Sequence, residues 1–250
     1  MPMTDTELEG LRDFKVLTFD CYGTLIDWET GIWDAFQPLI AGNERSDIRR
    51  GDMLEAFAGF ESALESESPR LPYPEVLEQV HRAAAGHYRL QTTAELDSEF
   101  GRSVPHWPAF PDTADALRFL KTRYRLVILS NIDRNSFAAS NRKLGVEFDA
   151  VCTAEDIGSY KPDPANFNFL LEHLQRAFGL EKPDILHTAQ SLFHDHVPAR
   201  ALGLATAWID RQRLSESGTW GATARLEEIP RTDFLFHSMD EMAAAAARAF

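Results

Sequence analysis

Short apolar segments that alternate with helical segments constrain the fold of this chain more than any other feature. We predict β-strands at residues 15–20, 125–130, 149–153, 185–189, 205–209 and 233–236. Amphipathic segments between the later strands predict helices at 113–123, with Asp112 as N-cap, at 135–144 and at 165–178. Continuous apolar strands separated by helices are typical of a parallel sheet covered on both faces. The sequence therefore predicts an α/β fold with a Rossmann-like parallel sheet as its core.

The segment from residue 28 to residue 108 interrupts this pattern, because it has helical periodicity only. Trp33, Phe36, Leu39 and Ile40 share one helical stripe, and a further helix is predicted at 76–90. Three prolines between residues 105 and 111 indicate a stiff return to the core. We therefore expect a catalytic core formed by 1–27 and 109–250, and an inserted all-helical cap domain at 28–108.

Charge and composition exclude several classes of partner. The chain has 250 residues and a formal net charge of −14 at pH 7, which argues against binding to nucleic acid or to an anionic membrane surface. No apolar run is long enough to span a bilayer. Residues 1–13 are polar and acidic, unlike a signal peptide, and two cysteines are too few for a disulfide framework. We expect a cytoplasmic protein.

Polar residues gather where the predicted strands end. Asp20 follows the first strand, Ser130 and Asn131 follow the second, and Gln190 to Asp195 follow the fourth, while Lys161 lies beyond the third. Ligands of open parallel sheets bind at the carboxyl ends of the strands. A carboxylate such as that of Asp20 is costly at a buried strand end unless it is paired or used. The sequence therefore predicts that these residues converge in one site.

In this order, the motifs FDCYGTL, ILSN, YKPD and QSLFHDHVPARALGL resemble the signatures of the haloacid dehalogenase (HAD) superfamily. Most members of that superfamily are Mg²⁺-dependent phosphatases, which carry a second acid where this chain has Tyr22 and a Gly-Asp pair where it has Ala189-Gln190. A hard dication needs several anionic oxygens, and this set is poor in them. The resemblance is therefore to the L-2-haloacid dehalogenase branch, which implies no metal and no cofactor.

That resemblance implies a substrate and a mechanism. Asp20 is expected to attack C2 of a short (S)-2-haloacid, including haloacetates such as chloro- or fluoroacetate, and to form an aspartyl ester that water hydrolyses to the 2-hydroxy acid. Lys161 is expected to keep Asp20 ionised by lowering its pKa. Asp195 is expected to hold Lys161 and to polarise the water. The partners are then the halogenated acid and the halide product, and the resemblance also implies a homodimer.

The remaining site residues follow from the same resemblance. Ser130 and the backbone at Cys21 and Tyr22 are expected to bind the substrate carboxylate, and Asn131 the halide. A cap arginine, for which Arg49 and Arg50 are the candidates, is expected to contribute to the halide site. Thr24 is expected to orient the loop of the nucleophile. The other expected pocket residues are Gln190, Ser191 and His194. Phe167 stands where many relatives carry a tyrosine.

Other interpretations stay open at this point. A phosphatase with an unusual metal site and a non-catalytic anion-binding member are both compatible with the motifs. Lys161 could be a solvated turn residue, and Asp195 could be the N-cap of the helix that follows it. His194 and His196 flank Asp195, but two histidines on one loop are a weak indication of a metal site.

Overall fold

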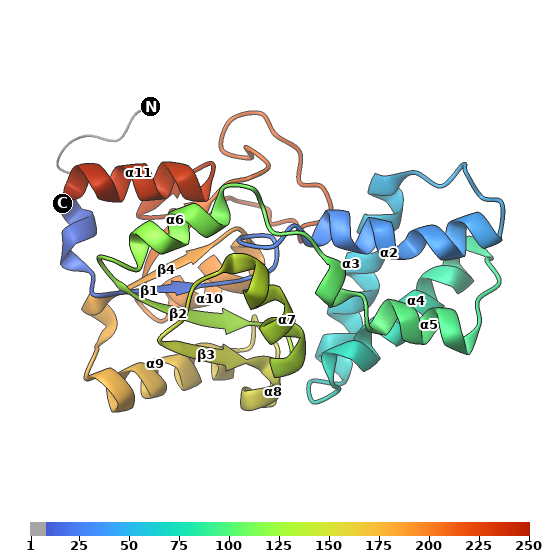
Figure 1. Cartoon of the computed structure of the whole chain (residues 1–250), viewed down its shortest axis with the longest axis horizontal. Helices are drawn as coiled ribbons and strands as arrows, with labels where there is room; N and C mark the ends of the chain where they lie inside the picture. The colour runs from blue at the N-terminus through green and yellow to red at the C-terminus, as the bar shows by residue number, and fades with distance from the viewer. Residues whose placement is uncertain (1–8) are drawn as a thin grey trace.

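The computed structural model describes residues 9–250, and its centre is a six-stranded sheet (Figure 1). All strand pairings are parallel, in the order β3-β2-β1-β4-β5-β6. The strands are β1 (Val16–Phe19), β2 (Arg125–Ser130), β3 (Ala150–Thr153), β4 (Ile185–Ala189), β5 (Ala205–Ile209) and β6 (Phe234–Phe236). The predicted α/β fold is confirmed. The prediction that the chain lacks a leader rests partly on residues 1–8, which lie outside the described residues.

Helices cover both faces of the sheet, and each face has its own hydrophobic cluster. On one side, α6 (Thr113–Leu120) and α11 (Met239–Ala249) pack against each other (Figure 1). On the other side, α9 (Pro164–Phe178) and α10 (Val197–Ala201) cover the strands, with Leu170 and Leu174 in a separate cluster. The remaining elements of the core are α7 (Arg134–Leu144), α8 (Ala154–Ile157), η1 (Gly10–Asp13) and η3 (Lys182–Asp184).

Asp112 is the N-cap residue of α6, as predicted, but its side chain does not cap the helix. The helix begins at Thr113, but the Asp112 side chain makes no capping hydrogen bond. Its carboxylate instead accepts from both terminal nitrogens of Arg211 at 3.2 Å and from the backbone N–H of Met239 at 2.8 Å. A charged guanidinium is a stronger donor than a helix-end amide. Asp112 therefore ties the loop after β5 to the start of α11.

Between β1 and β2 the chain forms four α-helices that stand apart from the sheet as a second lobe (Figure 1). They are α2 (Trp28–Gly42), α3 (Arg50–Glu67), α4 (Tyr73–Tyr88) and α5 (Ala94–Gly101), followed by η2 (Val104–His106). Helix α4 begins three residues before the predicted start at residue 76, because Pro74 is accommodated in its first turn. We retain 28–108 as the proposed boundaries of the cap domain.

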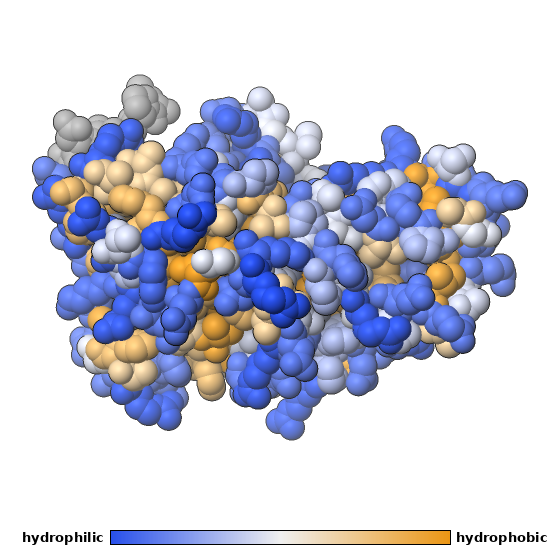
Figure 2. All heavy atoms as spheres, viewed as in Figure 1, coloured by the Kyte–Doolittle hydropathy of each residue, from blue (hydrophilic) through white to orange (hydrophobic). Residues whose placement is uncertain are grey.

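The surface in Figure 2 is mostly hydrophilic, and the hydrophobic side chains visible on this face gather mainly over the sheet-containing lobe. No helix among residues 9–250 has the length and apolar character that a bilayer span requires.

Candidate active site

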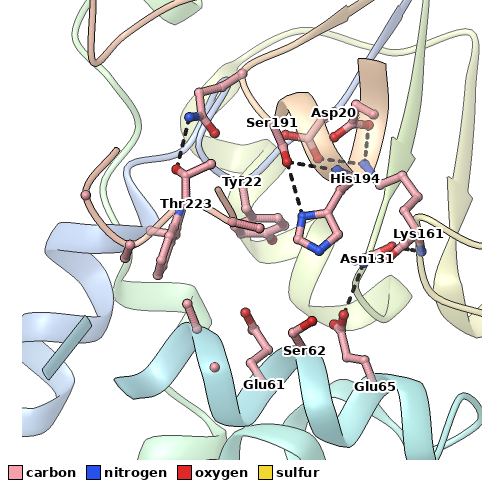
Figure 3. A pocket seen from close by; sticks show the side chains of 18 of the residues that line it. Asp20, Tyr22, Glu61, Ser62, Glu65, Asn131, Lys161, Ser191, His194 and Thr223 are labelled. Atoms are coloured by element: carbon pink, nitrogen blue, oxygen red, sulfur yellow. Dashed lines mark hydrogen bonds and ion pairs between the residues drawn. The ribbon is translucent and has the colours of Figure 1, made fainter. Parts of the chain in front are cut away.

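Most of the predicted site residues surround a cavity of about 670 Å³ between the strand ends and helix α3 (Figure 3). Asp20 directly follows β1, and Ser130 ends the neighbouring strand β2. Asp195 lies on η4 (Leu192–His196), a short π-helix that follows β4 on the other side of β1. The site thus lies where the strand order reverses, as expected for an open parallel sheet.

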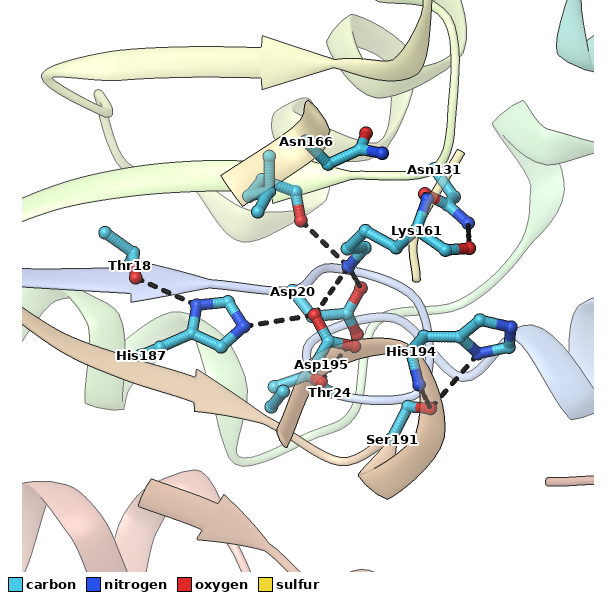
Figure 4. Close-up of polar contacts among 12 residues, drawn as sticks. Thr18, Asp20, Thr24, Asn131, Lys161, Asn166, His187, Ser191, His194 and Asp195 are labelled. Carbon is cyan, nitrogen blue, oxygen red and sulfur yellow. Dashed lines mark hydrogen bonds and ion pairs between the residues drawn. The ribbon is translucent and has the colours of Figure 1, made fainter. Parts of the chain in front are cut away.

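Lys161 joins the two acids at the base of the cavity (Figure 4). Its ammonium group donates to Asp20 Oδ1 at 2.8 Å, to Asp195 Oδ1 at 2.7 Å and to the Leu129 carbonyl at 3.1 Å. All three of its N–H bonds are used, and the side chain is only 2% exposed. The interpretation of Lys161 as a solvated turn residue is therefore wrong.

Burial and charge act against each other in this cluster. Burial alone would lower the pKa of Lys161, but Asp195 and Asp20 raise it above its ordinary value, so the ammonium form is favoured. Burial would raise the pKa of Asp195, yet Lys161 and His187 hold it below its ordinary value. For Asp20, burial outweighs Lys161 and the pKa is raised. Lys161 lowers the pKa of Asp20, as expected, but burial has the larger effect and the nearby Asp195 also raises the pKa.

His187 on β4 belongs to the same network, although the sequence analysis treated it as part of a strand. Its Nε2 lies 3.0 Å from Asp195 Oδ1, and its Nδ1 lies 2.9 Å from the hydroxyl of Thr18 on β1 (Figure 4). All contacts are satisfied if Nε2–H donates to Asp195 and the Thr18 hydroxyl donates to Nδ1. Histidine within the apolar run ILHTA was the signal available in the sequence.

Thr24 holds the loop after β1, as predicted, but it does not line the cavity. Its hydroxyl donates to Asp20 Oδ2 at 2.7 Å and accepts from the backbone N–H of Gln190 at 2.9 Å. Gly23 precedes it with φ +95°, and a Cβ there would be 3.1 Å from Gln190 Oε1. Only glycine adopts this conformation at little cost, so the loop can close tightly over the strand ends.

Ser130 and Asn131 extend from the end of β2, and they differ in their partners. The buried Ser130 hydroxyl has no hydrogen-bond partner among the described residues and borders the cavity. Asn131 is already engaged: its Nδ2 donates to the Lys161 carbonyl and to Glu65 Oε2, and its Oδ1 accepts from the Lys161 N–H. The Nδ2–H of Asn131 that is donated to Glu65 is therefore available to a ligand only after the hydrogen bond to Glu65 breaks.

The structure brings most of the predicted site residues together and leaves three outside the cavity. Those that line it are Asp20, Tyr22, Ser130, Asn131, Lys161, Gln190, Ser191, His194 and Asp195. Cys21 packs into the hydrophobic core, and Thr24 acts through Asp20 and Gln190. Arg50 lies at the exposed start of α3 and donates to Thr30. Arg49, the other candidate, pairs with Asp52 instead of facing the site.

The structure also shows two features of the shape of the pocket. Phe167 is fully buried against the His187 ring rather than in the cavity, so the missing hydroxyl does not alter the pocket wall. The cavity is also larger than a two-carbon acid would fill, because about 670 Å³ lies within the range of pockets for much larger ligands.

Residues of helix α3 and of one loop of the core also line the cavity, although the sequence did not predict them. Helix α3 presents Glu55, Glu61, Ser62 and Glu65 to the cavity, and the loop between β5 and β6 adds Thr223 and Arg225. Glutamates on a helix and polar residues in a long loop are usually solvent-exposed. Nothing in the sequence pattern identifies these as pocket residues.

The two histidines flanking Asp195 have separate surroundings. Ser191 Oγ accepts from the His194 backbone N–H and lies 3.1 Å from its Nδ1, while His196 Nε2 lies 2.9 Å from the Ala189 carbonyl. Burial lowers the pKa of both imidazoles to about 4, so both are neutral at pH 7. No cluster of three or more metal-ligating side chains occurs among residues 9–250. Asp195 is not a helix cap, because its carboxylate is committed to Lys161 and His187.

The parallel sheet, its helical insertion and the acid–lysine–acid cluster together define an α/β fold with a candidate active site at the carboxyl ends of its strands. The particular family follows from comparison with known proteins. The chain matches the family model of haloacid dehalogenase-like hydrolases over residues 14–187, more than half of its length, and it belongs to this family. The predicted superfamily is therefore confirmed.

Known relatives point to one branch of the family. An (S)-2-haloacid dehalogenase from Pseudomonas putida is 24% identical over 215 residues, covering 81% of this chain and 87% of the relative. The solved L-2-haloacid dehalogenase of Xanthobacter autotrophicus aligns with a TM-score of 0.75 at 17% identity, covering 94% of this chain and 98% of that one. The magnesium-bound HAD-hydrolase YfnB of Bacillus subtilis aligns with a TM-score of 0.73 at 19% identity, covering 94% and 99%. The solved structures that share this fold therefore include both a named L-2-haloacid dehalogenase and a magnesium-bound hydrolase.

Proposed function

We propose that this enzyme hydrolyses the carbon–halogen bond of (S)-2-haloacids without a metal ion. The observation that carries the proposal is the position of Lys161, whose ammonium lies between the carboxylates of Asp20 and Asp195. Three of the four carboxylate oxygens of Asp20 and Asp195 already accept from Lys161, Thr24 or His187, so only Asp195 Oδ2 is left for a divalent cation, which needs several anionic oxygens. The donor set therefore fits an ammonium and does not fit magnesium.

Asp20 is the proposed nucleophile. One of its oxygens attacks C2 of the haloacid, the C2–halogen bond breaks, and the halide leaves with the bonding electrons. Lys161 and Thr24 each donate to a different oxygen of Asp20, which opposes the effect of burial and fixes the carboxylate in one orientation. An ionised carboxylate needs no base for this step. Lys161 and Thr24 therefore contribute by keeping the carboxylate ionised and by fixing its orientation.

Hydrolysis of the resulting ester requires an aligned water. The water oxygen attacks the carbonyl carbon of the Asp20 ester, and the bond from that carbon to the ester oxygen, which Asp20 itself supplied, breaks. That oxygen takes one water proton and leaves as the hydroxyl of the 2-hydroxy acid, while the water oxygen stays in the Asp20 carboxylate and the second proton is released. Asp195 Oδ2 is buried beside the site and has no hydrogen-bond partner among the described residues. It is the oxygen available to accept a hydrogen bond from that water, while Lys161 and His187 hold the other one.

The unpartnered Ser130 hydroxyl is the proposed donor to the substrate carboxylate. Arg50 is not proposed for the halide, because its guanidinium donates to Thr30 outside the cavity. The homodimer and the cytoplasmic location remain predictions.

The proposal is tested by halide release from 2-chloropropionate enantiomers and monohaloacetates in the presence of EDTA, beside a panel of phosphate esters with magnesium. We expect release from the (S)-enantiomer that EDTA does not reduce. Asp20→Asn keeps the shape of the side chain and is expected to lower release by at least about a thousandfold. Magnesium-dependent phosphate release without halide release would establish the phosphatase alternative instead.

A further inference from the structure

Aromatic side chains line the part of the cavity next to the loop of the nucleophile. Tyr22 lies two residues after Asp20, and Trp28 is the first residue of α2. The indole Nε1 of Trp28 lies 3.2 Å from the position that a Cβ on Gly23 would take, so this ring is close to the same loop. Both aromatic residues line the cavity and are only half-buried. Part of each ring is therefore left for a ligand to cover.

The polar ends of these aromatic residues are bonded to protein atoms outside the cavity wall. The Tyr22 hydroxyl lies 2.8 Å from Oγ of Ser140, a fully buried residue of α7. Trp107, which also lines the cavity, donates its indole N–H to Ser103 Oγ at 3.1 Å. Tyrosine and tryptophan normally find such partners when they are buried. What these residues offer to the cavity is therefore ring carbon.

Other aromatic rings hold this wall in place. Trp107 meets the Tyr22 ring edge-on, with 5.5 Å between the ring centroids. The Trp28 ring packs against that of Phe57, a fully buried residue of α3, at 5.8 Å. We call Tyr22, Trp28 and Trp107 the aromatic wall. Because its rings are already packed, little conformational entropy is lost when a ligand binds to it.

Helix α3 forms the opposite side of the cavity, and most of the residues that it contributes are small. Ala58, Gly59, Ser62 and Ala63 are among them, and Figure 3 shows Ser62 across the cavity from Tyr22. Small side chains leave the space between the helix and the aromatic wall open. The cavity of about 670 Å³ therefore has room for a side chain much larger than the methyl group of a 2-halopropionate.

The glutamates of α3 are less charged than exposed glutamates at the same pH. Burial raises the pKa of Glu61 to about 7, and the Tyr73 hydroxyl donates to this carboxyl at 2.7 Å. Burial and the nearby Glu61 raise the pKa of Glu65, while Lys161 opposes them. A protonated carboxyl is easier to desolvate than a charged one. An apolar group can therefore lie beside this helix at a lower cost.

Building on the proposed dehalogenation, on which this inference rests, we propose that the site takes (S)-2-haloacids with an aryl group on the side chain, such as (S)-2-chloro-3-phenylpropanoate. The substrate carboxylate would lie at Ser130 and C2 at Asp20, and the aryl ring would fill the space between the aromatic wall and α3. Aromatic rings prefer edge-to-face or offset contacts with one another, and a flat substituent can make such contacts with Tyr22 and Trp28.

The first test compares the (S)-enantiomers of 2-chloro-3-phenylpropanoate, 2-chloro-3-cyclohexylpropanoate and 2-chloropropanoate. We expect kcat/KM for the phenyl substrate to exceed that for 2-chloropropanoate by about a hundredfold, because the ring buries as much apolar surface as a phenylalanine side chain. It should exceed that for the cyclohexyl substrate by about fivefold, because only the phenyl ring makes aromatic contacts. Equal values for the phenyl substrate and 2-chloropropanoate, or a preference for either non-aromatic substrate, would overturn the inference.

A substitution on α3 tests whether the open space is used. Ala63→Leu places a larger side chain in the cavity without disturbing the core, since Ala63 is exposed. We expect it to lower the ratio of kcat/KM for the phenyl substrate to that for 2-chloropropanoate by about tenfold. Ala56→Leu, on the same helix but outside the cavity wall, is the matched control and should leave the ratio unchanged. An unchanged ratio in Ala63→Leu, or an equal fall in both variants, would contradict the inference.

The second test does not depend on turnover. Calorimetry of the wild-type enzyme at several temperatures compares (R)-3-phenyllactate with (R)-lactate, the products expected from inversion at C2. We expect phenyllactate to bind about a hundredfold more tightly and with a more negative heat-capacity change, because it buries an apolar ring. Equal dissociation constants would contradict the inference.

The two tests also separate this inference from the proposed function. Tight binding of phenyllactate without halide release from any chloro acid would refute dehalogenation and support the aromatic wall as a binding surface. Halide release with equal values for the phenyl substrate and 2-chloropropanoate, and equal binding of the two hydroxy acids, would support dehalogenation and refute aryl recognition.

Discussion

At the scale of single residues, the site depends on one lysine that is shared by two acids. Removing either acid would leave Lys161 with half of its charge partners, and removing Lys161 would leave Asp20 and Asp195 as close like charges. Loss of one member of a buried pair typically costs about 3–5 kcal/mol. Substitutions here therefore change stability as well as activity, and each kinetic result needs a measurement of folding beside it.

Glu61 provides a residue-scale prediction that needs no substrate. An unfolded glutamate has a pKa of about 4.3, and burial raises that of Glu61 to about 7. Between these values the folded state binds more protons than the unfolded state, so this residue makes the free energy of unfolding fall as the pH rises. Glutamine keeps an oxygen that can accept from Tyr73 but does not ionise. Relative to wild type, we expect Glu61→Gln to become more stable between about pH 5 and about pH 8.

The measurement is the melting temperature of both proteins across this pH range. Glu67→Gln, at the exposed end of the same helix, is the matched control and should follow wild type. A constant difference between Glu61→Gln and wild type would show that the pKa of Glu61 is not raised in the folded state.

At the scale of elements, the cap is attached to the core through close packing of α2 on the return segment. Trp107 is 1% exposed and lies against Gly31 of α2, where any Cβ would overlap the indole ring. The Trp107 ring also meets Tyr22, beside the nucleophile, edge-on at 5.5 Å between ring centroids. A side chain at position 31 would therefore displace a residue that touches the wall of the site.

We expect Gly31→Ala to destabilise the protein by about 2–3 kcal/mol, because the indole cannot move without opening the packed core. Gly86→Ala, inside α4, is the control, because a Cβ there meets nothing within 4 Å. It should stabilise the protein by up to about 1 kcal/mol through helix propensity. Urea unfolding of the three proteins measures both effects, and equal stability of Gly31→Ala and wild type would disprove the packing argument.

At the scale of the whole molecule, the core was predictable because its signals are local. Apolar strands, helix-ending glycines such as Gly145 and Gly179, and polar strand ends are each visible within a few residues. Parallel pairing then brings Asp20, Ser130 and Asp195 to the same edge by topology alone.

The features of the site that the sequence did not predict depend on contacts between elements that are far apart in the chain. The choice of Arg49 or Arg50 as a halide ligand followed sequence position, but the helix turns both away and presents Glu61 and Glu65 instead. The partner of Asp112 is Arg211, 99 residues further along the chain. The packing of distant elements against each other decides which face of a helix lines a pocket. Hydrophobic periodicity in the sequence does not predict this packing.

The central claim is that Asp20 attacks carbon and becomes an ester. A single turnover of excess enzyme with (S)-2-chloropropionate in 18O-labelled water, followed by mass spectrometry of the peptide that contains Asp20, tests it most directly. Because water attacks the Asp20 carbonyl carbon, we expect the label in the Asp20 carboxylate and unlabelled lactate in the first turnover. Labelled lactate with an unlabelled Asp20 would mean that water attacks the substrate directly, and the account would be wrong.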